Sequence, residues 1–356
     1  MTHLRWLIHR LMSLAVLLGI TSCGAAAAAD DDLARQPWAG RSDAVFHRIV
    51  TVPMSISELT QDAQGFLWIG TQYGLSRWDG YQLRHYLGDI ASPGALPDSY
   101  VLALHVDTDK RLWVGTSAGG LVRYDAAGDR FVQPLAAGAA LSRKNVQAML
   151  GDGPGRLWVG TGGGLDLLDT RHGTVQSHAA LARAQGLPDG AVHALLHDAA
   201  GGLWVGTDGG LFRRAAGSER FLNVALPAED GVPFVARLLL DSQRRIWVGT
   251  RSHGAFVVEP GVGEAVPLHR RLKTAGDEAG AIAKAAVLFM AEAAPEDVWL
   301  SADAGGFLRI DTRSWEMRRI RRRPDSTTSL PDDDIAAVYR DRGGLVWVAT
   351  DTGLSH

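Results

Sequence analysis

The chain has 356 residues, of which 46% are hydrophobic and 21% are charged, and its formal net charge is −3. This composition excludes a disordered acidic chain and a bundle of membrane helices, and the charge gives no reason to expect a nucleic acid as partner. The single cysteine excludes an internal disulfide and a cysteine-based zinc site. The 42 glycines indicate many tight turns.

The chain begins with a pattern typical of export. A short basic start that contains Arg5 and Arg10 is followed by the apolar run Leu11–Ile20 and then by Ala25–Ala29. This order predicts a signal peptide over residues 1–29, followed by a linker over residues 30–43. We therefore expect a periplasmic protein.

Two questions about this export signal stay open. The segment that ends at Cys23 also resembles the lipobox of bacterial lipoproteins, so lipidation at Cys23 is the alternative to cleavage after Ala29. The apolar run is too short to span a bilayer, which takes about 20 residues. The later apolar stretch Ala281–Ala291 is also short and contains Lys284, so we expect no transmembrane segment in the mature chain.

One short sequence pattern recurs seven times in the rest of the chain. It reads Leu-Trp-Val-Gly-Thr at residues 112–116, and its tryptophans are spaced 43 to 52 residues apart at Trp68, Trp113, Trp158, Trp204, Trp247, Trp299 and Trp347. Each unit adds an alternating apolar segment before the Trp segment, a turn such as Asp62–Gly65, and two further short segments. Four short strands in about 45 residues are typical of a propeller blade. We expect an all-β, seven-bladed β-propeller of four-stranded antiparallel blades over residues 44–356.

The alternation of side chains along a strand predicts how the blades pack. Leu112 and Val114 are expected to pack against one neighbouring blade and Trp113 against the other, with Gly115 leaving room beside the ring.

The two ends of the repeat region predict how the ring closes. Residues 44–50 read as a fourth strand without a Trp unit, whereas the last unit, from Ile335, lacks a fourth strand. We therefore expect the N-terminal strand to complete the last blade and remove the exposed sheet edges. The third strand of the last unit is short, which leaves open whether the natural chain is truncated after His356 or continues.

These repeats resemble the two-component regulator propeller family over about residues 46–356. The similarity rests on Leu-Pro pairs before the blades, such as Leu96-Pro97, and on the Asp-x-x-Gly-x-Leu-Trp-Val-Gly-Thr pattern. The resemblance implies a periplasmic ligand-sensing propeller of a two-component-type signalling system. It also implies a carbohydrate or cell-envelope ligand and a membrane-bound signalling partner. No kinase or cyclase domain is present in this sequence, so we expect no enzyme activity. The alternatives are a lyase-like propeller enzyme with a metal-assisted His253, and a scaffold for protein–protein interaction.

The expected ligand site lies at one mouth of the central channel, where the turns after the Trp strands meet the connections into the first strands. These turns differ in sequence from blade to blade, whereas the strands that flank them repeat the same pattern, and such variation is typical of recognition surfaces. The residues expected to bind ligand are Tyr73, Asp208, Arg251, His253, Asp303 and Asp351. Arg251 with His253 stands out, because the first four repeats place small, Gln, Tyr or acidic residues there, and we expect an anionic or polyhydroxy ligand.

Other candidate motifs yield little chemistry. His193 and His197 are four residues apart, but on a strand this spacing separates them by about 13 Å, so a shared metal is not expected. No motif of a catalytic, metal or cofactor site is present. The basic run Arg318–Arg323 is interpreted as a charged outer edge strand, with a docking patch for a polyanionic glycan or lipid headgroups as the alternative.

Overall fold

The structure is a computed structural model that describes residues 46–50, 55–177, 185–261, 263–273, 277–287, 289–301, 305–326, 328–350 and 352–356. For residues 48, 50 and 277–280 only the backbone is described. The chain divides into two units, residues 1–45 and 46–356, and the described residues all belong to the second. The predicted signal peptide, linker and Cys23 therefore lie outside the described residues, and they stay predictions.

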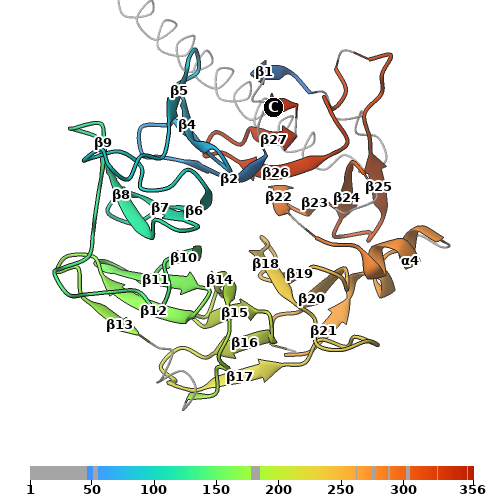
Figure 1. Ribbon diagram of the computed structural model, residues 1–356. Helices are drawn as coiled ribbons and strands as arrows, with labels where there is room; N and C mark the ends of the chain where they lie inside the picture. Colours follow the sequence, from blue (N-terminus) through green and yellow to red (C-terminus); the bar gives the residue numbers. More distant parts are fainter. Residues whose placement is uncertain are drawn as a thin grey trace, which may run out of the picture. The chain divides into compact units, whose positions relative to one another are not determined.

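Seven four-stranded antiparallel sheets form the second unit, as the sequence predicts. Figure 1 shows the sheets arranged around a common centre. The innermost strands are β2 (Ile56–Gln61), β6 (Val101–Val106), β10 (Val146–Gly151), β14 (Val192–His197), β18 (Val235–Leu240), β22 (Met290–Ala294) and β26 (Ile335–Arg340). Each of them contacts the innermost strand of the next sheet, and β26 contacts β2, so the circle is closed.

The remaining strands follow outward in the same order in every blade. The Trp strands are β3 (Leu67–Thr71), β7 (Leu112–Thr116), β11 (Arg156–Thr161), β15 (Leu203–Thr207), β19 (Ile246–Thr250), β23 (Asp297–Ser301) and β27 (Val346–Thr350). The third strands are β4 (Gly74–Trp78), β8 (Leu121–Asp125), β12 (Gly164–Asp169), β16 (Gly210–Arg214), β20 (Ala255–Val258), β24 (Phe307–Asp311) and β28 (Gly353–Ser355). The outer strands are β5 (Leu83–Tyr86), β9 (Arg130–Val132), β13 (Val175–Ser177), β17 (Phe221–Val224), β21 (Ala265–Pro267), β25 (Met317–Ile320) and β1 (Arg48–Val50).

The N-terminal strand closes the ring, which confirms the prediction from the sequence. Strand β1 pairs antiparallel with β28 as the fourth strand of the last blade, with Arg48 opposite Ser355. Just before β1, the His47 amide donates to the His356 carbonyl at 2.8 Å, and the His356 amide donates to the His47 carbonyl at 3.2 Å. Strand pairing thus joins the two ends of the unit and covers a sheet edge.

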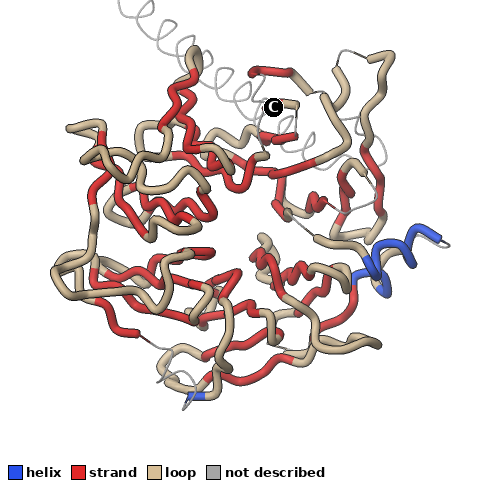
Figure 2. The backbone as a smooth tube through the Cα atoms, viewed as in Figure 1, coloured by secondary structure: helices blue, strands red, loops and turns tan. Residues whose placement is uncertain are grey.

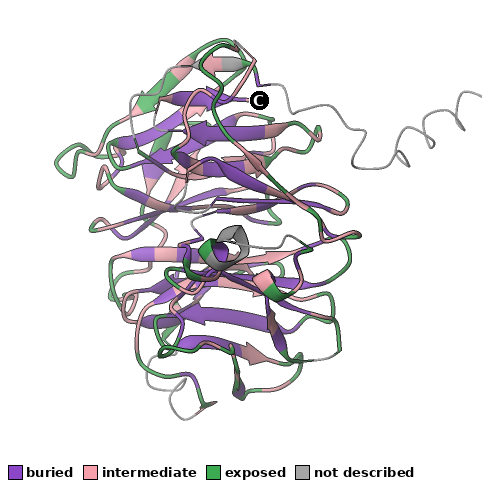
Figure 3. Ribbon diagram, turned by 90° about the vertical axis from the view of Figure 1, so that its right-hand side faces the viewer, coloured by how far each residue is buried: buried purple, intermediate pink, exposed green. Residues whose placement is uncertain are grey.

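The Trp strand of each blade packs on both neighbouring blades. Trp113 is fully buried and belongs to a cluster with Leu157 and Val159 of the next blade. Leu112 and Val114 belong to a different cluster, which contains the Trp of the preceding blade. The predicted alternation is confirmed, and Figure 3 shows that the buried residues follow the strands through the layers of sheet.

The glycine two residues after the Trp, within the Trp strand, makes room for the next blade. A Cβ atom added to Gly115 would lie 2.6 Å from Cγ1 of Val146, the first residue of the next innermost strand. The same approach recurs between Gly206 and Val235, at 2.5 Å. The space that the sequence predicts beside Trp113 is therefore filled by a neighbouring valine, which belongs to the same cluster as the Trp.

A hydrogen bond from the Trp ring to an aspartate supports six of the blades, and it was not predicted from the sequence. In these blades the indole Nε1–H donates to a carboxylate at 2.7–3.0 Å; the acceptors are Asp62, Asp107, Asp198, Asp241, Asp297 and Asp341. Five of them open the predicted turn, and Asp62 also accepts the amides of Gln64 and Phe66. One carboxylate thus caps the turn and fixes the Trp ring.

Helices enter between the fifth and sixth blades, where the spacing of the tryptophans is longest. The 3-10 helix η2 (Leu268–Arg270) and the helix α4 (Asp277–Lys284) lie there (Figure 2). Ile282 and Ala285 are buried in one cluster with Leu268 and Val257, which explains why a helix is stable in this all-β unit. The sequence analysis predicted strands alone. The stretch Ala281–Ala291 is divided between the end of α4 and the start of β22, and within the described ranges no helix has the length and apolarity to cross a membrane.

Candidate functional site

A hollow of about 600 Å³ lies where the turns after the Trp strands meet the connections into the innermost strands. We call it the mouth hollow. Gln72 and Arg251 reach it from two of these turns, and Ser55, Tyr100 and Phe234 reach it from residues that immediately precede innermost strands. Its volume lies within the range of about 300–1,000 Å³ that is usual for small-molecule sites.

Arg251 is the predicted site residue that lines this hollow. Its guanidinium carbon lies 4.4 Å from the centre of the Phe234 ring, and its amide donates to the Phe234 carbonyl at 3.1 Å. The other neighbour of Phe234 is the ring of His193, at 4.2 Å between ring centres. The stack of His193, Phe234 and Arg251 holds a cation in a fixed position at the mouth, where its N–H groups can meet an anionic or hydroxyl-rich ligand.

The other predicted residues are placed differently. His253 does not line the hollow: its Nε2 lies 2.7 Å from the Asp230 carbonyl oxygen and its Nδ1 lies 3.0 Å from the Ser252 hydroxyl. Tyr73 is 60% exposed and lies outside the lining. Asp208 is exposed, also outside the lining, but close enough to act on the charge of His193. Asp303 and Asp351 lie outside the described residues.

His193 is a functional candidate that sequence reasoning considered only as half of a metal pair. Burial lowers the pKa of His193 to about 4; Asp208 acts in the opposite direction, and Arg251 and Arg237 add to the lowering. The imidazole is therefore neutral near neutral pH. Its Nε2 is buried without a hydrogen-bond partner, which leaves one position free for a ligand group.

A second hollow, of about 440 Å³, adjoins the first and is called the inner hollow. Gln147, His193, Arg237 and Phe289 line both hollows, so these side chains form their common boundary. Glu58 lines the inner hollow but not the mouth hollow. Neither Glu58 nor Arg237 was singled out from the sequence, although both replace the small residue that most repeats have at that place.

The search for metal ligands gives no candidate among the residues that the structure describes: no three His, Cys, Asp or Glu side chains are grouped to hold an ion. His193 and His197 lie on strand β14, as predicted. The basic run begins on β25, the outermost strand of the sixth blade, in agreement with its interpretation as an edge strand.

Comparison with known proteins identifies the repeats. Residues 95–118 and 186–209 match the family model described as two component regulator propeller. These two segments are two-component regulator propeller repeats. Each matched segment runs from a Leu-Pro connection through the innermost strand and the Trp strand of one blade, the second and the fourth. The resemblance read from the sequence is thereby confirmed. No curated protein matches the chain.

Solved structures share the fold of this propeller. The extracellular domain of the putative hybrid two component system BT4673 from B. thetaiotaomicron has 23% identity and a TM-score of 0.70, and the match covers 88% of this chain and 39% of that one. The corresponding domain of BT3049 from the same organism has 20% identity and a TM-score of 0.72, covering 88% and 41%. A streptogramin B lyase has 13% identity and a TM-score of 0.62, covering 88% and 98%. The chain thus spans about two fifths of the length of the two extracellular domains.

Proposed function

We propose that this propeller is the ligand-sensing part of an exported, two-component-type signalling system and that it binds its ligand in the mouth hollow. The proposal places the protein in the periplasm and has it act through a membrane-bound signalling partner. The two-component regulator propeller repeats support this role. So does the fold shared with extracellular domains of hybrid two component systems, which extend well beyond the length that the chain covers.

The observation that carries the proposal is the chemistry of the mouth hollow. Its lining carries two cations and two carboxylates, from Arg237, Arg251, Asp333 and Asp334. Ser57, Gln72 and Gln147 add hydroxyl and amide groups, and the partly exposed Tyr100 ring adds an apolar face. We propose that Arg251 meets the acidic substituent of the ligand and that the carboxylates accept from its hydroxyl groups. Such a mixture suits a ligand with many hydroxyl groups and an acidic substituent, because charged and polar groups fix its orientation and an aromatic face covers its apolar side. We therefore propose an acidic carbohydrate or cell-envelope fragment as the ligand.

We further propose that binding at this site is not accompanied by catalysis. The rival reading was a lyase-like enzyme that uses His253 with a metal ion. His253 faces away from the hollow, and both its ring nitrogens lie within hydrogen-bond distance of neighbouring oxygens. Metal-dependent turnover that is lost in His253→Ala would contradict this part of the proposal.

The test is isothermal titration of the full chain with neutral and acidic oligosaccharides and with peptidoglycan fragments. Arg251→Ala is expected to weaken binding of the acidic members by about tenfold or more, since a hydrogen bond to a charged group is lost. Arg220→Ala is the matched control, because Arg220 is an exposed arginine outside the lining of both hollows. Binding that is equal in Arg251→Ala and wild type, or a panel without any binding member, would overturn the proposal.

A further inference from the structure

The innermost strands place one residue from each blade at the same register. In six blades this residue is paired with the small residue two places after the Trp. In the sixth blade along the chain, Phe289 lies just before the innermost strand and accepts the amide of Ser301, the residue two places after the Trp. The seven residues are Glu58, Ala103, Ala148, Ala194, Arg237, Phe289 and Ala337. Four of the seven are alanines with little exposed surface. Two of the exceptions carry opposite charges, and both line the inner hollow.

These two charges come from blades that are not neighbours. Glu58 belongs to β2 in the first blade and Arg237 to β18 in the fifth, and Figure 1 shows these strands on different sides of the centre of the ring. The charge of Arg237 lowers the pKa of Glu58, but no direct ion pair joins the two among the contacts of the described residues. The guanidinium instead lies 5.1 Å from the centre of the Phe289 ring, and it donates through Nη1 to the Ala236 carbonyl at 3.0 Å.

Arg237 and His193 each keep one nitrogen free for a ligand. The Nε of Arg237 and the Nε2 of His193 are buried and have no hydrogen-bond partner. Burial raises the pKa of Glu58, and the charge of Arg237 offsets this only in part. A charge that is partly removed from water destabilises the fold unless a group of opposite charge compensates it. Glu58 and Arg237 stand where four other blades have alanine, so we expect a bound molecule that contacts both charges.

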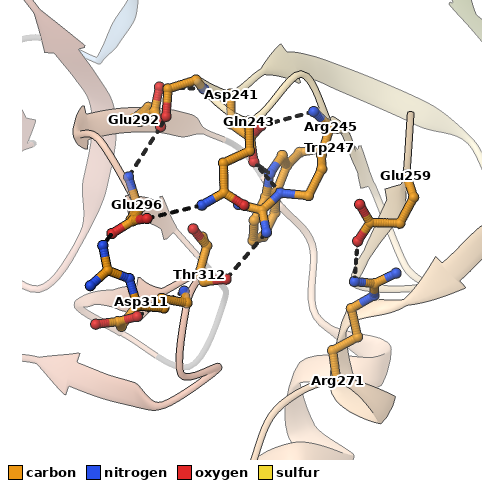
Figure 4. A network of polar contacts seen from close by, with 12 residues as sticks. Asp241, Gln243, Arg245, Trp247, Glu259, Arg271, Glu292, Glu296, Asp311 and Thr312 are labelled. Atoms are coloured by element: carbon orange, nitrogen blue, oxygen red, sulfur yellow. Dashed lines mark hydrogen bonds and ion pairs between the residues drawn. The ribbon is translucent and has the colours of Figure 1, made fainter. Parts of the chain in front are cut away.

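The other charged residues of the inner hollow do not supply that group. The carboxylate of Glu292 accepts the Ser242 hydroxyl at 2.6 Å and the Ser242 amide at 2.9 Å (Figure 4 shows Glu292 in its network). Arg340 is exposed. Glu58 has a backbone hydrogen bond from Leu59, and Arg237 donates to the Ala236 carbonyl, but no carboxylate of the inner hollow pairs with Arg237 among the described residues.

We propose that the inner hollow binds a small zwitterion, whose ammonium group meets Glu58 and whose carboxylate meets Arg237 and Nε2 of His193. An α-amino acid is the simplest molecule of this class. A guanidinium offers two parallel N–H donors to a carboxylate, and the neutral His193 can donate a third hydrogen bond. Arg237 and His193 line both hollows, whereas Glu58 lines only the inner one, so Glu58 is the residue that distinguishes this site from the mouth hollow.

The experiment is isothermal titration of the full chain with L-alanine, L-serine and L-glutamine, and with propionate and ethylamine as probes that carry one charge each. We expect the amino acids to bind and the single-charge probes to bind at least about 30-fold more weakly, since a buried charge would then remain unpaired. Glu58→Ala and Arg237→Ala restore the residue found in four other blades, and each is expected to weaken amino-acid binding by a similar factor. Glu58→Gln is a second variant that keeps the size of the side chain, and it is expected to have the same effect.

Two controls make the result specific. Glu316→Ala removes an exposed carboxylate outside both hollows and is expected to leave the affinity unchanged. Glu58→Ala is expected to weaken the amino acids but not the acidic oligosaccharides of the mouth hollow, because Glu58 lines only the inner hollow, so the two proposals fail separately. No binding by any amino acid, binding that Glu58→Ala and Glu58→Gln retain, or equal binding of propionate would overturn the zwitterion site.

Discussion

Replacement of Asp241 by asparagine tests how strongly the buried carboxylate under the Trp ring supports a blade. The side chain of Asp241 is fully buried and that of Arg245 is 5% exposed. Asp241 accepts from Trp247 Nε1 at 2.8 Å, from Arg245 Nε at 2.6 Å and from the Arg245 amide at 2.8 Å. Arg245 also donates to the Thr312 carbonyl of the sixth blade at 3.2 Å, so this pair lies at the junction of two blades (Figure 4).

Asp241→Asn leaves the buried Arg245 guanidinium without its counter-charge. The new side-chain NH2 group also faces N–H donors of Arg245 and Trp247, to which it cannot donate. Loss of one partner of a buried pair costs about 3–5 kcal/mol. For a unit of this size, that cost lowers the melting temperature by about 5–8 °C. Thermal unfolding followed by circular dichroism at pH 7 measures this shift.

Asp341→Asn in the seventh blade is the matched control for this experiment. Asp341 accepts the Trp347 ring at 3.0 Å and the Leu345 amide at 2.9 Å, but Leu345 stands where the fifth blade has Arg245. Without a buried cation, the expected loss is about 1–2 kcal/mol, or about 2–3 °C. Equal losses in the two variants, or an Asp241→Asn protein as stable as wild type, would refute the argument from the buried ion pair.

Three further predictions concern stability. Gly206→Ala is expected to cost about 1–3 kcal/mol in chemical denaturation, because its Cβ would lie 2.5 Å from Val235 Cγ1, whereas Ala349→Gly at the same place in the seventh blade creates no clash. Burial lowers the pKa of His193 to about 4, so its contribution to the free energy of unfolding is present above pH 6.5 and is lost as the pH falls toward 4. Melting curves of His193→Gln should lack this loss of stability at acid pH. A pH profile that is the same in His193→Gln and wild type would contradict the burial. Burial raises the pKa of Glu58, so its contribution to the free energy of unfolding is present below pH 4.5 and is lost as the pH rises. Without ligand, Glu58→Ala should therefore be more stable than wild type by a larger margin at pH 7 than at pH 4. A margin that does not depend on pH would contradict this reasoning.

The architecture could be predicted because every blade repeats the same local pattern. The alternation around Trp113 and its glycine determines which faces meet, and the unmatched strand at the N-terminus determines how the ring closes. The helix α4 was missed because it lies in the longest interval between tryptophans, where the repeat itself gives no guide. The bond from the Trp ring to the aspartate six residues earlier was missed in Trp68 and its equivalents, because the aspartate was assigned only to its turn.

The ligand site stays a prediction, and the structure shows where some of the predicted residues lie. The turns after the Trp strands do lead to a hollow, and Arg251 lines it. The direction of a side chain within a turn depends on backbone angles that the sequence pattern does not give, and His253 accordingly faces Asp230 instead. Glu58 and Arg237 were missed because a β-bulge near the start of each innermost strand shifts the alternation. Alignment of the seven innermost strands would have shown that Glu58 and Arg237 stand where four other blades have alanine.

The affinity of the full chain for acidic oligosaccharides, measured by isothermal titration in wild type and in Arg251→Ala, tests the central claim most directly. The account predicts saturable binding to wild type and a loss of about tenfold or more in the variant. It also predicts wild-type affinity in Arg220→Ala. Saturable binding with the same affinity in Arg251→Ala as in wild type would contradict the claim that the mouth hollow is the sensing site.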